Sequence, residues 1–368
     1  RRESLLEDQS ELNLFKEHKA TPNQLYDYYL GYLKNPSITH HIQPVPDSTV
    51  EFAKTWGMRV AVQDLQAVIG AAKNLGGKVV LGGHSLGGSV VTAYATWNFN
   101  GRPGADDLAG LVYIDGGSSP TPVAAQAATQ ELQSLNAPGA TPWLSFGGIP
   151  APFAGIYAAT GSAAALLDPD APSLGQSSGL LPADIVPPVP VTNAGQYGFA
   201  LNAATSPSSL LAAQAHLGQG VAAAGPVHGW NGSGALTPLN RFATMFSGYP
   251  IQNADGTEWY FPQRLTDDTG AVANGNANPA QSVLDVADTM GHDLPKNLLI
   301  YAFGARLGGA GVPQDAQLLA NQSGIPASNL TLANYQGLYS HNDPAGAYPN
   351  NAFFDRLVPF LGKVATQK

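Results

Sequence analysis

The sequence predicts an α/β fold in which a mostly parallel sheet is flanked by helices, because strand-like and helix-like stretches alternate along the chain. Short apolar runs, typical of strands buried on both faces, occur at residues 79–81, 111–114, 297–304 and 330–335. Helical patterns occupy residues 59–75, 313–322 and the segment after 353. A strand, a sharp turn and a helix follow one another directly between Val79 and Val91.

Signals for helix ends divide the first part of the chain. A helix is expected to begin at Thr21, whose hydroxyl can cap it, with Pro22 in its first turn. It should stop at Asn35, which precedes a proline. The helix over residues 59–75 is closed by two glycines and leads into the strand that precedes the sharp turn.

Residues 118–290 have a different pattern, in which Ala-rich segments alternate with Pro and Gly. A stretch of this length is too long for a loop in a compact domain. Short helices are expected within it at residues 124–135, 206–216 and 279–290. We therefore expect an inserted domain at 118–290 between two parts of one core, residues 1–117 and 291–368. An unrelated separate domain is the alternative.

Composition excludes several classes of function. The net charge of −9 and the absence of any Lys or Arg cluster argue against nucleic acid as a partner. There is no cysteine, so disulfides, thiolate metal sites and cysteine catalysis are excluded. Only 12% of residues are charged, and no Lys or Arg lies between Arg102 and Arg241, which favours an extracellular or periplasmic protein. No run is long and apolar enough for a transmembrane segment.

The stretch Gly83-His84-Ser85-Leu86-Gly87 carries the clearest chemical signal. A serine flanked by glycines two residues away, at a turn from strand to helix, is held in a strained backbone conformation with its hydroxyl above the sheet. We expect the His84 side chain to face away from that hydroxyl. The stretch is similar to the nucleophile elbow of serine esterases and lipases of the α/β-hydrolase family.

The resemblance implies a catalytic triad. Ser85 would be the nucleophile and the Leu86 N–H the first oxyanion donor. His341 would be the base, because Ser-His-Asn-Asp-Pro after the last strand resembles the histidine loop of esterase-like members. Most members carry the acid after the seventh strand, where this chain has no carboxylate before Asp315. A minority of members carry the acid one strand earlier, where Asp115 stands at a strand end before two glycines, so the resemblance implies Asp115 as the acid, with Asp315 as the alternative.

The resemblance also implies parts of the fold. Residues 118–290 would be a cap inserted after the sixth strand. Residues 1–8 are similar to the segment that follows the fourth strand, so the opening strands would lie upstream of Arg1. Four strands are few, and a sheet that ends at the serine strand leaves an apolar edge. We expect a segment upstream of Arg1, either an N-terminal fragment of the same precursor that stays bound or an N-terminal part that this sequence omits, to complete the sheet and to supply the second oxyanion donor.

The expected function is hydrolysis of carboxylic esters, with hydrophobic or lipid-like small molecules as substrates. Amide cleavage and acyl transfer use the same triad, and a catalytically silent ligand-binding member of the family is a further alternative. We expect no cofactor. We also expect no metal site, since the adjacent pair His40 and His41 lacks the spacing of two ligands on one helix face.

Overall fold

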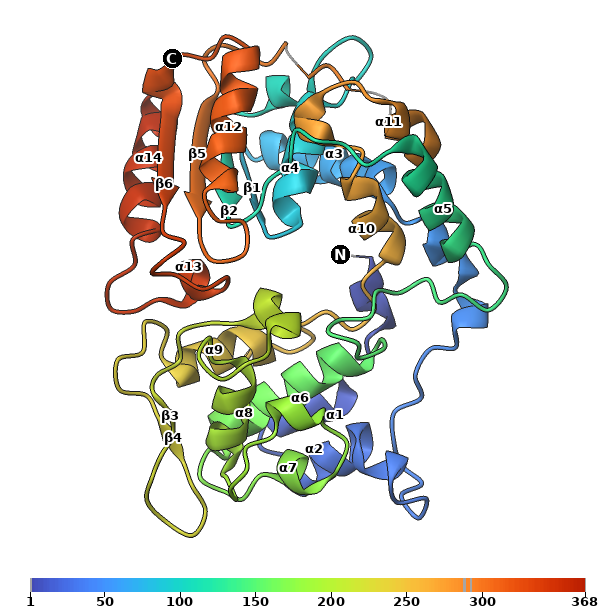
Figure 1. Cartoon of the computed structure of the whole chain (residues 1–368), viewed down its shortest axis with the longest axis vertical. Coiled ribbons are helices and arrows are strands. Elements are labelled where there is room, and N and C mark those ends of the chain that lie inside the picture. The colour runs from blue at the N-terminus through green and yellow to red at the C-terminus, as the bar shows by residue number, and fades with distance from the viewer. Residues whose placement is uncertain (1, 287–288, 292, 368) are drawn as a thin grey trace. The chain divides into compact units, whose positions relative to one another are not determined.

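The four predicted strands form one sheet in the computed structural model, which describes residues 2–286, 289–291 and 293–367 (Figure 1). The strands are β1 (Val80–His84), β2 (Gly110–Ile114), β5 (Leu299–Gly304) and β6 (Leu330–Asn334). They are all parallel and lie in the order β1-β2-β5-β6. The prediction of an α/β fold with a parallel sheet flanked by helices is confirmed at this level.

The central strands β2 and β5 are buried on both faces, which explains why they are continuous apolar runs, whereas the edge strands β1 and β6 are partly exposed. Along β5, Ile300 and Ala302 belong to the core on one face of the sheet, to which several helices contribute side chains. Tyr301 and Phe303 alternate with them and contact aromatic side chains on the other face; the Tyr301 and Phe360 ring centroids lie 5.8 Å apart. The helices of the first face are α3 (Met58–Asn74), α4 (Gly87–Thr96) and α12 (Gly311–Gln322), and α14 (Phe354–Thr366) covers the second (Figure 1).

Two compact units make up the chain. The sheet unit comprises residues 47–143, 262–344 and 351–368, and the helical unit comprises residues 1–46, 144–261 and 345–350. Besides the elements named above, the sheet unit contains α5 (Ala125–Leu135), α10 (Gln263–Thr269) and α11 (Pro279–Leu284). The short helix α13 (Asp343–Gly346) follows β6. No described helix is long and apolar enough to cross a membrane.

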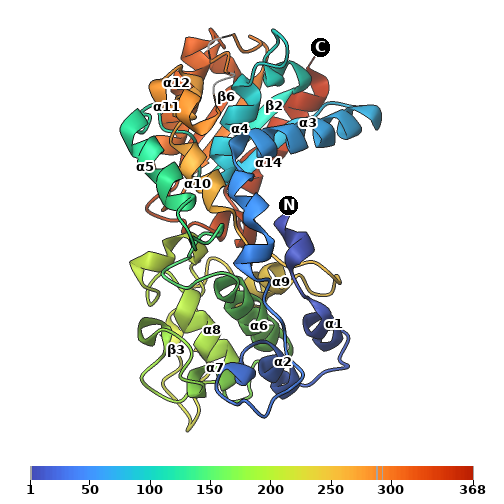
Figure 2. The same cartoon turned by 90° about the vertical axis from the view of Figure 1, so that its right-hand side faces the viewer.

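The helical unit is built around α6 (Phe153–Leu167), which lies alongside α8 (Asn193–Leu201) and α9 (Leu239–Ser247) (Figure 2). Its core includes the buried side chains of Tyr197 and Phe242. The remaining elements are α1 (Ser10–Lys16), α2 (Pro22–Tyr29), α7 (Leu174–Ser177), β3 (Gly220–Val221) and β4 (Trp230–Asn231). As expected, α2 begins with a capping box in which the Thr21 side chain accepts from the N–H of Gln24.

The boundaries of the units differ from those expected at 117 and 290. Residues before 47 pack in the helical unit, where α1 and α2 contact α6 and the buried Lys16 ammonium donates to the Ala254 carbonyl. No change in composition occurs near residue 46, so residues 1–46 were expected to belong to the core. Residues 118–143 and 262–290 belong to the sheet unit, where α5 and α11 contact each other.

Three predicted helices are also shorter than expected. The helix expected to stop at Asn35 ends at Tyr29, and residues 31–33 form a separate 3-10 helix. Residues 208–213 form only a 3-10 helix, because the Gln214 amide donates to the carbonyls of Ser206 and Pro207 and holds the segment as a turn. Helix α11 ends at Leu284, since Asp285 adopts a left-handed conformation with φ of 58°. Of the predicted 279–290 helix, residues 287 and 288 lie outside the described part.

The strand β1 pairs only with β2 among the described residues, so its outer edge has no strand partner there. Gly82 on this strand is exposed. The expectation that a further segment completes the sheet stays a prediction.

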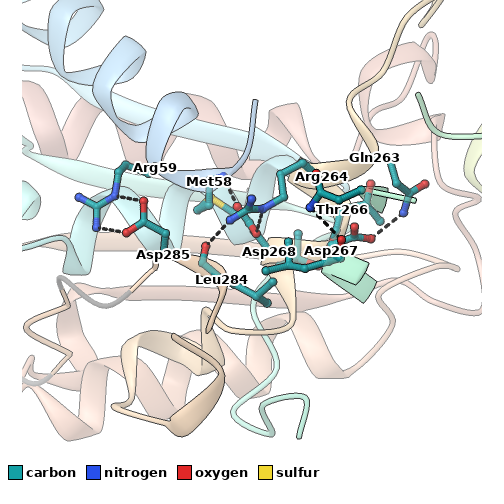
Figure 3. Close-up of polar contacts among 12 residues, drawn as sticks. Met58, Arg59, Gln263, Arg264, Thr266, Asp267, Asp268, Leu284 and Asp285 are labelled. Carbon is teal, nitrogen blue, oxygen red and sulfur yellow. Dashed lines mark hydrogen bonds and ion pairs between the residues drawn. The ribbon is translucent and has the colours of Figure 1, made fainter. Parts of the chain in front are cut away.

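A buried ion pair joins three helices of the sheet unit (Figure 3). Asp268 of α10 accepts hydrogen bonds from the Met58 N–H at the start of α3, at 2.7 Å, and from Arg264 Nε, at 2.6 Å. Arg264 also donates to the Leu284 carbonyl at the end of α11. A side chain at Gly57 would place its Cβ 2.0 Å from the Asp268 carboxylate, so this close approach requires glycine. Burial raises the pKa of Asp268 to about 6, although the Arg264 charge opposes the shift.

Arg264→Met should destabilise the protein by roughly 3–5 kcal/mol at pH 8, because it leaves the buried Asp268 carboxylate without its cation. The folded state binds the Asp268 proton more tightly than the unfolded chain does, so this group's contribution to stability falls as pH rises from about 4 to 6. Above pH 6 the Asp268 carboxylate is ionised, and removal of Arg264 makes this buried charge more destabilising. The loss should therefore be smaller at pH 5, measured by urea unfolding at both values.

Asp285→Asn is the matched control. Asp285 pairs with Arg59 at 2.6 Å, but its side chain is 63% exposed, and exposed pairs contribute about 0–1 kcal/mol. Asparagine also tolerates the left-handed backbone at this position. Equal losses for the two variants, or a loss for Arg264→Met that does not change with pH, would contradict the role given to the buried pair.

Candidate active site

Ser85 and Asp115 follow neighbouring strands at the same edge of the sheet. The last paired residues of β1 and β2 are His84 and Ile114, and the Ser85 N–H donates to the Ile114 carbonyl at 3.0 Å. Both Ser85 and Asp115 have left-handed backbones, with φ of 58° and 45°. Such conformations are costly for residues other than glycine and concentrate at functional sites.

Glycines allow the backbone segments around Ser85 to approach closely. A Cβ at Gly116 would lie 1.8 Å from the Ser85 carbonyl oxygen, and one at Gly83 would lie 2.1 Å from that of Gly87. Gly88 is equally constrained, since its Cβ would lie 2.3 Å from the Gly116 backbone. Gly87 itself has open space at the Cβ position. The glycine requirement at this turn therefore comes from positions 83, 88 and 116.

Asp115 and His341 form a buried pair. His341 Nδ1 lies 2.7 Å from Asp115 Oδ2, and each residue is 1% exposed. The carboxylate also accepts three backbone N–H bonds from the turn after β5: from Ala305 at 2.6 Å, Leu307 at 3.0 Å and Gly308 at 2.9 Å. Four donors thus fix the position of the carboxylate.

The hydrogen bonds determine the protonation state of this pair. Burial alone would raise the pKa of Asp115, but the hydrogen bond and charge of His341, with the N–H groups of Ala305 and Leu307, hold it below its usual value. An ionised carboxylate only accepts, so His341 Nδ1 carries the proton. With the proton on Nδ1, the lone pair of an unprotonated imidazole is on Nε2, the atom that a general base uses.

His84 contacts His341, an arrangement that the sequence analysis missed. His84 Nε2 lies 2.8 Å from the His341 carbonyl oxygen, and the two rings are 4.2 Å apart between centroids, tilted by 32°. Burial, followed by the nearby His341 charge, lowers the pKa of His84 to about 4. The position of His84 next to Ser85 was the one available signal, but sequence alone does not show where its ring points.

Ser85 lies beside this pair, but it makes no hydrogen bond with His341 within the part of the chain that the structure describes. Its side chain is half-buried. Catalytic hydrogen bonds are often long in structures without substrate, so the separation leaves a role as nucleophile open. Leu86 caps α4, and the first N–H groups of a helix have no acceptor within it. The Leu86 N–H is thus available as an oxyanion donor.

Asp315 lies on α12 and does not contact His341, whose Nδ1 is already bonded to Asp115. Burial raises the pKa of Asp315 to about 6. The structure therefore pairs Asp115 with His341, places Ser85 after the neighbouring strand at the same edge of the sheet, and leaves Asp315 outside the pair.

Comparisons with known proteins add nothing to this geometry, because no family model, no curated protein and no solved structure matches the chain. Across residues 2–286, 289–291 and 293–367, no three His, Asp or Glu side chains are grouped so that they could hold a metal ion. Ser85, Asp115 and His341 all belong to the sheet unit.

Gly116→Ala should destabilise the protein by at least about 3 kcal/mol, the upper end of overpacking costs, because the new methyl would collide with the Ser85 backbone. Gly117→Ala is the matched control, since the nearest atom to its Cβ would be 4.0 Å away, and it should change stability by less than about 1 kcal/mol. Thermal unfolding of both variants measures the difference. A fully stable Gly116→Ala protein would show that the two turns do not approach as closely as described.

Proposed function

We propose that the protein is a serine hydrolase that cleaves carboxylic esters with Ser85, His341 and Asp115. The observation that carries the proposal is the buried pair of Asp115 and His341 at 2.7 Å, next to a serine held in a left-handed backbone at the end of a parallel strand. This combination supports an oriented base beside a serine on a strained turn, and nucleophilic catalysis by serine requires both a base and an accessible hydroxyl.

The chemistry follows from the protonation states. His341 Nε2 takes the proton from Ser85 Oγ as the oxygen attacks the ester carbonyl, and the Leu86 N–H donates to the resulting oxyanion. Collapse of the tetrahedral intermediate breaks the ester bond, and the leaving alcohol takes the proton from His341. Water, deprotonated by the same histidine, then attacks the acyl group on Ser85; the bond from the acyl carbon to Oγ breaks, Oγ takes the proton back from His341, and the acid is released. Asp115 stabilises the imidazolium in both steps.

The preference proposed for hydrophobic esters rests on the sequence between β2 and β5, which is poor in charged residues and contains several aromatic residues. Amide cleavage and acyl transfer would use the same three residues. One observation favours a catalytically silent ligand-binding protein, namely that no hydrogen bond joins Ser85 to His341 among the described residues. Reaction of Ser85 with a fluorophosphonate distinguishes an active serine from a silent one.

Ser85→Ala should abolish hydrolysis of p-nitrophenyl esters and labelling by a fluorophosphonate, with a loss in turnover on the order of a millionfold. The wild-type protein should be labelled on one serine, identified by peptide mass spectrometry. Ser282→Ala, at an exposed serine of α11, is the control and should be labelled normally. Substantial turnover by folded Ser85→Ala would remove Ser85 from the mechanism.

Asp115→Asn should lower kcat by about ten-thousandfold, as expected for loss of the acid in such a triad. Its amide nitrogen would have to face one of the four donors that surround the carboxylate, which also displaces His341. Asp315→Asn should retain most of the activity, because Asp315 does not contact the base. If Asp315→Asn instead proves the more damaging of the two, the acid has been assigned to the wrong strand.

A further inference from the structure

His84 contacts the proposed base in two ways. Its ring lies against the His341 ring, with centroids 4.2 Å apart, and its Nε2 reaches the His341 carbonyl oxygen at 2.8 Å. Because a carbonyl only accepts, His84 Nε2 must carry a proton. One side chain therefore restrains both the imidazole of His341 and the backbone that carries it.

The other hydrogen bonds of the loop after β6 do not involve the His341 carbonyl, and His84 supplies the donor for it. The Ser340 N–H donates to the Asp343 carboxylate at 2.6 Å, and Asp115 holds Nδ1 of the His341 ring. Neither of these bonds reaches the His341 carbonyl. His84 is the last residue of β1, so its hydrogen bond ties the loop after β6 to the strand that carries Ser85.

The charge state of His84 suits this role. The titratable groups that act on it are His341 and Asp115, and burial keeps its ring neutral at neutral pH. A neutral ring places no second positive charge beside the imidazolium that His341 forms during catalysis. A cation here would oppose the proton transfer from Ser85.

We propose that His84 is a positioning residue, whose hydrogen bond to the His341 carbonyl holds the imidazole of the base in register with Ser85. The proposal rests on the function proposed above. It also makes a structural claim of its own, that the Asp115–His341 hydrogen bond loosens when the His84 donor is lost. Simple packing against His341 would require only a ring of similar size.

Two substitutions separate the donor from the ring. His84→Phe keeps an aromatic ring but has no donor, whereas the amide nitrogen of His84→Gln can reach the position of Nε2. His228→Phe is the matched control, because His228 makes a similar bond, from Nδ1 to the Ala222 carbonyl at 2.7 Å, in the helical unit. Folding of each variant is checked by circular dichroism, and His84→Met replaces His84→Phe if the latter is unfolded.

The first readout is the rate at which a fluorophosphonate labels Ser85. We expect about a tenfold loss for His84→Phe, since a buried carbonyl is left without its donor. His84→Gln should recover most of the rate, and His228→Phe should react like the wild type. With an ester substrate, the loss should fall on kcat rather than on KM. A His84→Phe protein that reacts as fast as the wild type would overturn the proposal.

The second readout does not depend on activity. The His341 Nδ1 proton, bonded to Asp115, should give a downfield proton resonance, assigned by its loss in Asp115→Asn. We expect it to broaden or shift upfield in His84→Phe and to persist in His84→Gln. If the wild-type protein is not labelled at Ser85, the proposed function fails and the resonance alone decides the role of His84. An unchanged resonance in His84→Phe would then refute it.

Discussion

The carboxyl edge of the sheet depends on the hydrogen bonds that the Asp115 carboxylate accepts. A carboxylate that is 1% exposed is costly unless its oxygens are bonded, and here four donors converge on it. Three belong to the turn after β5, and the fourth is His341, which follows β6. The buried charge at the end of β2 thereby fixes the segments that follow two other strands.

The pH dependence of stability separates this site from the rest of the sheet unit. The lowered pKa values of Asp115 and His84 mean that the unfolded chain binds their protons more tightly. Their contribution to stability is lost as pH falls, for His84 between about 6.5 and 4. The raised pKa values of Asp268 and Asp315 act in the opposite direction, and their contribution falls as pH rises towards 6. Mild acid therefore lowers the stability contributed by Asp115 and His84 and raises the stability contributed by Asp268 and Asp315.

The strands were predictable because burial on both faces leaves a continuous apolar run, as in β5. The turn at Ser85 was predictable because its backbone geometry demands glycine at particular places. The unit boundaries were not, since the packing of α1 and α2 against α6 joins residues more than 100 positions apart. The contact of His84 with His341 has the same origin, because 257 positions separate the two residues. Local sequence patterns predict strands and turns, whereas contacts between segments that are distant in the sequence are seen only in the folded structure.

The turn after β5 explains why the carboxylate at this site comes from β2. Residues 305–308 contain no acid, and in the structure three of their N–H groups point to Asp115. A carboxylate on this turn would lie beside Asp115 and would compete for the same donors at a cost in like-charge repulsion. Small residues such as Ala305 and Gly308 instead allow the backbone itself to approach, and a Cβ at Gly308 would lie 3.1 Å from the Asp115 backbone. The same arrangement therefore explains why this turn has no acid and why Asp115 follows the neighbouring strand. The segment after β2 provides the charge, and the turn after β5 provides the N–H dipoles that stabilise it.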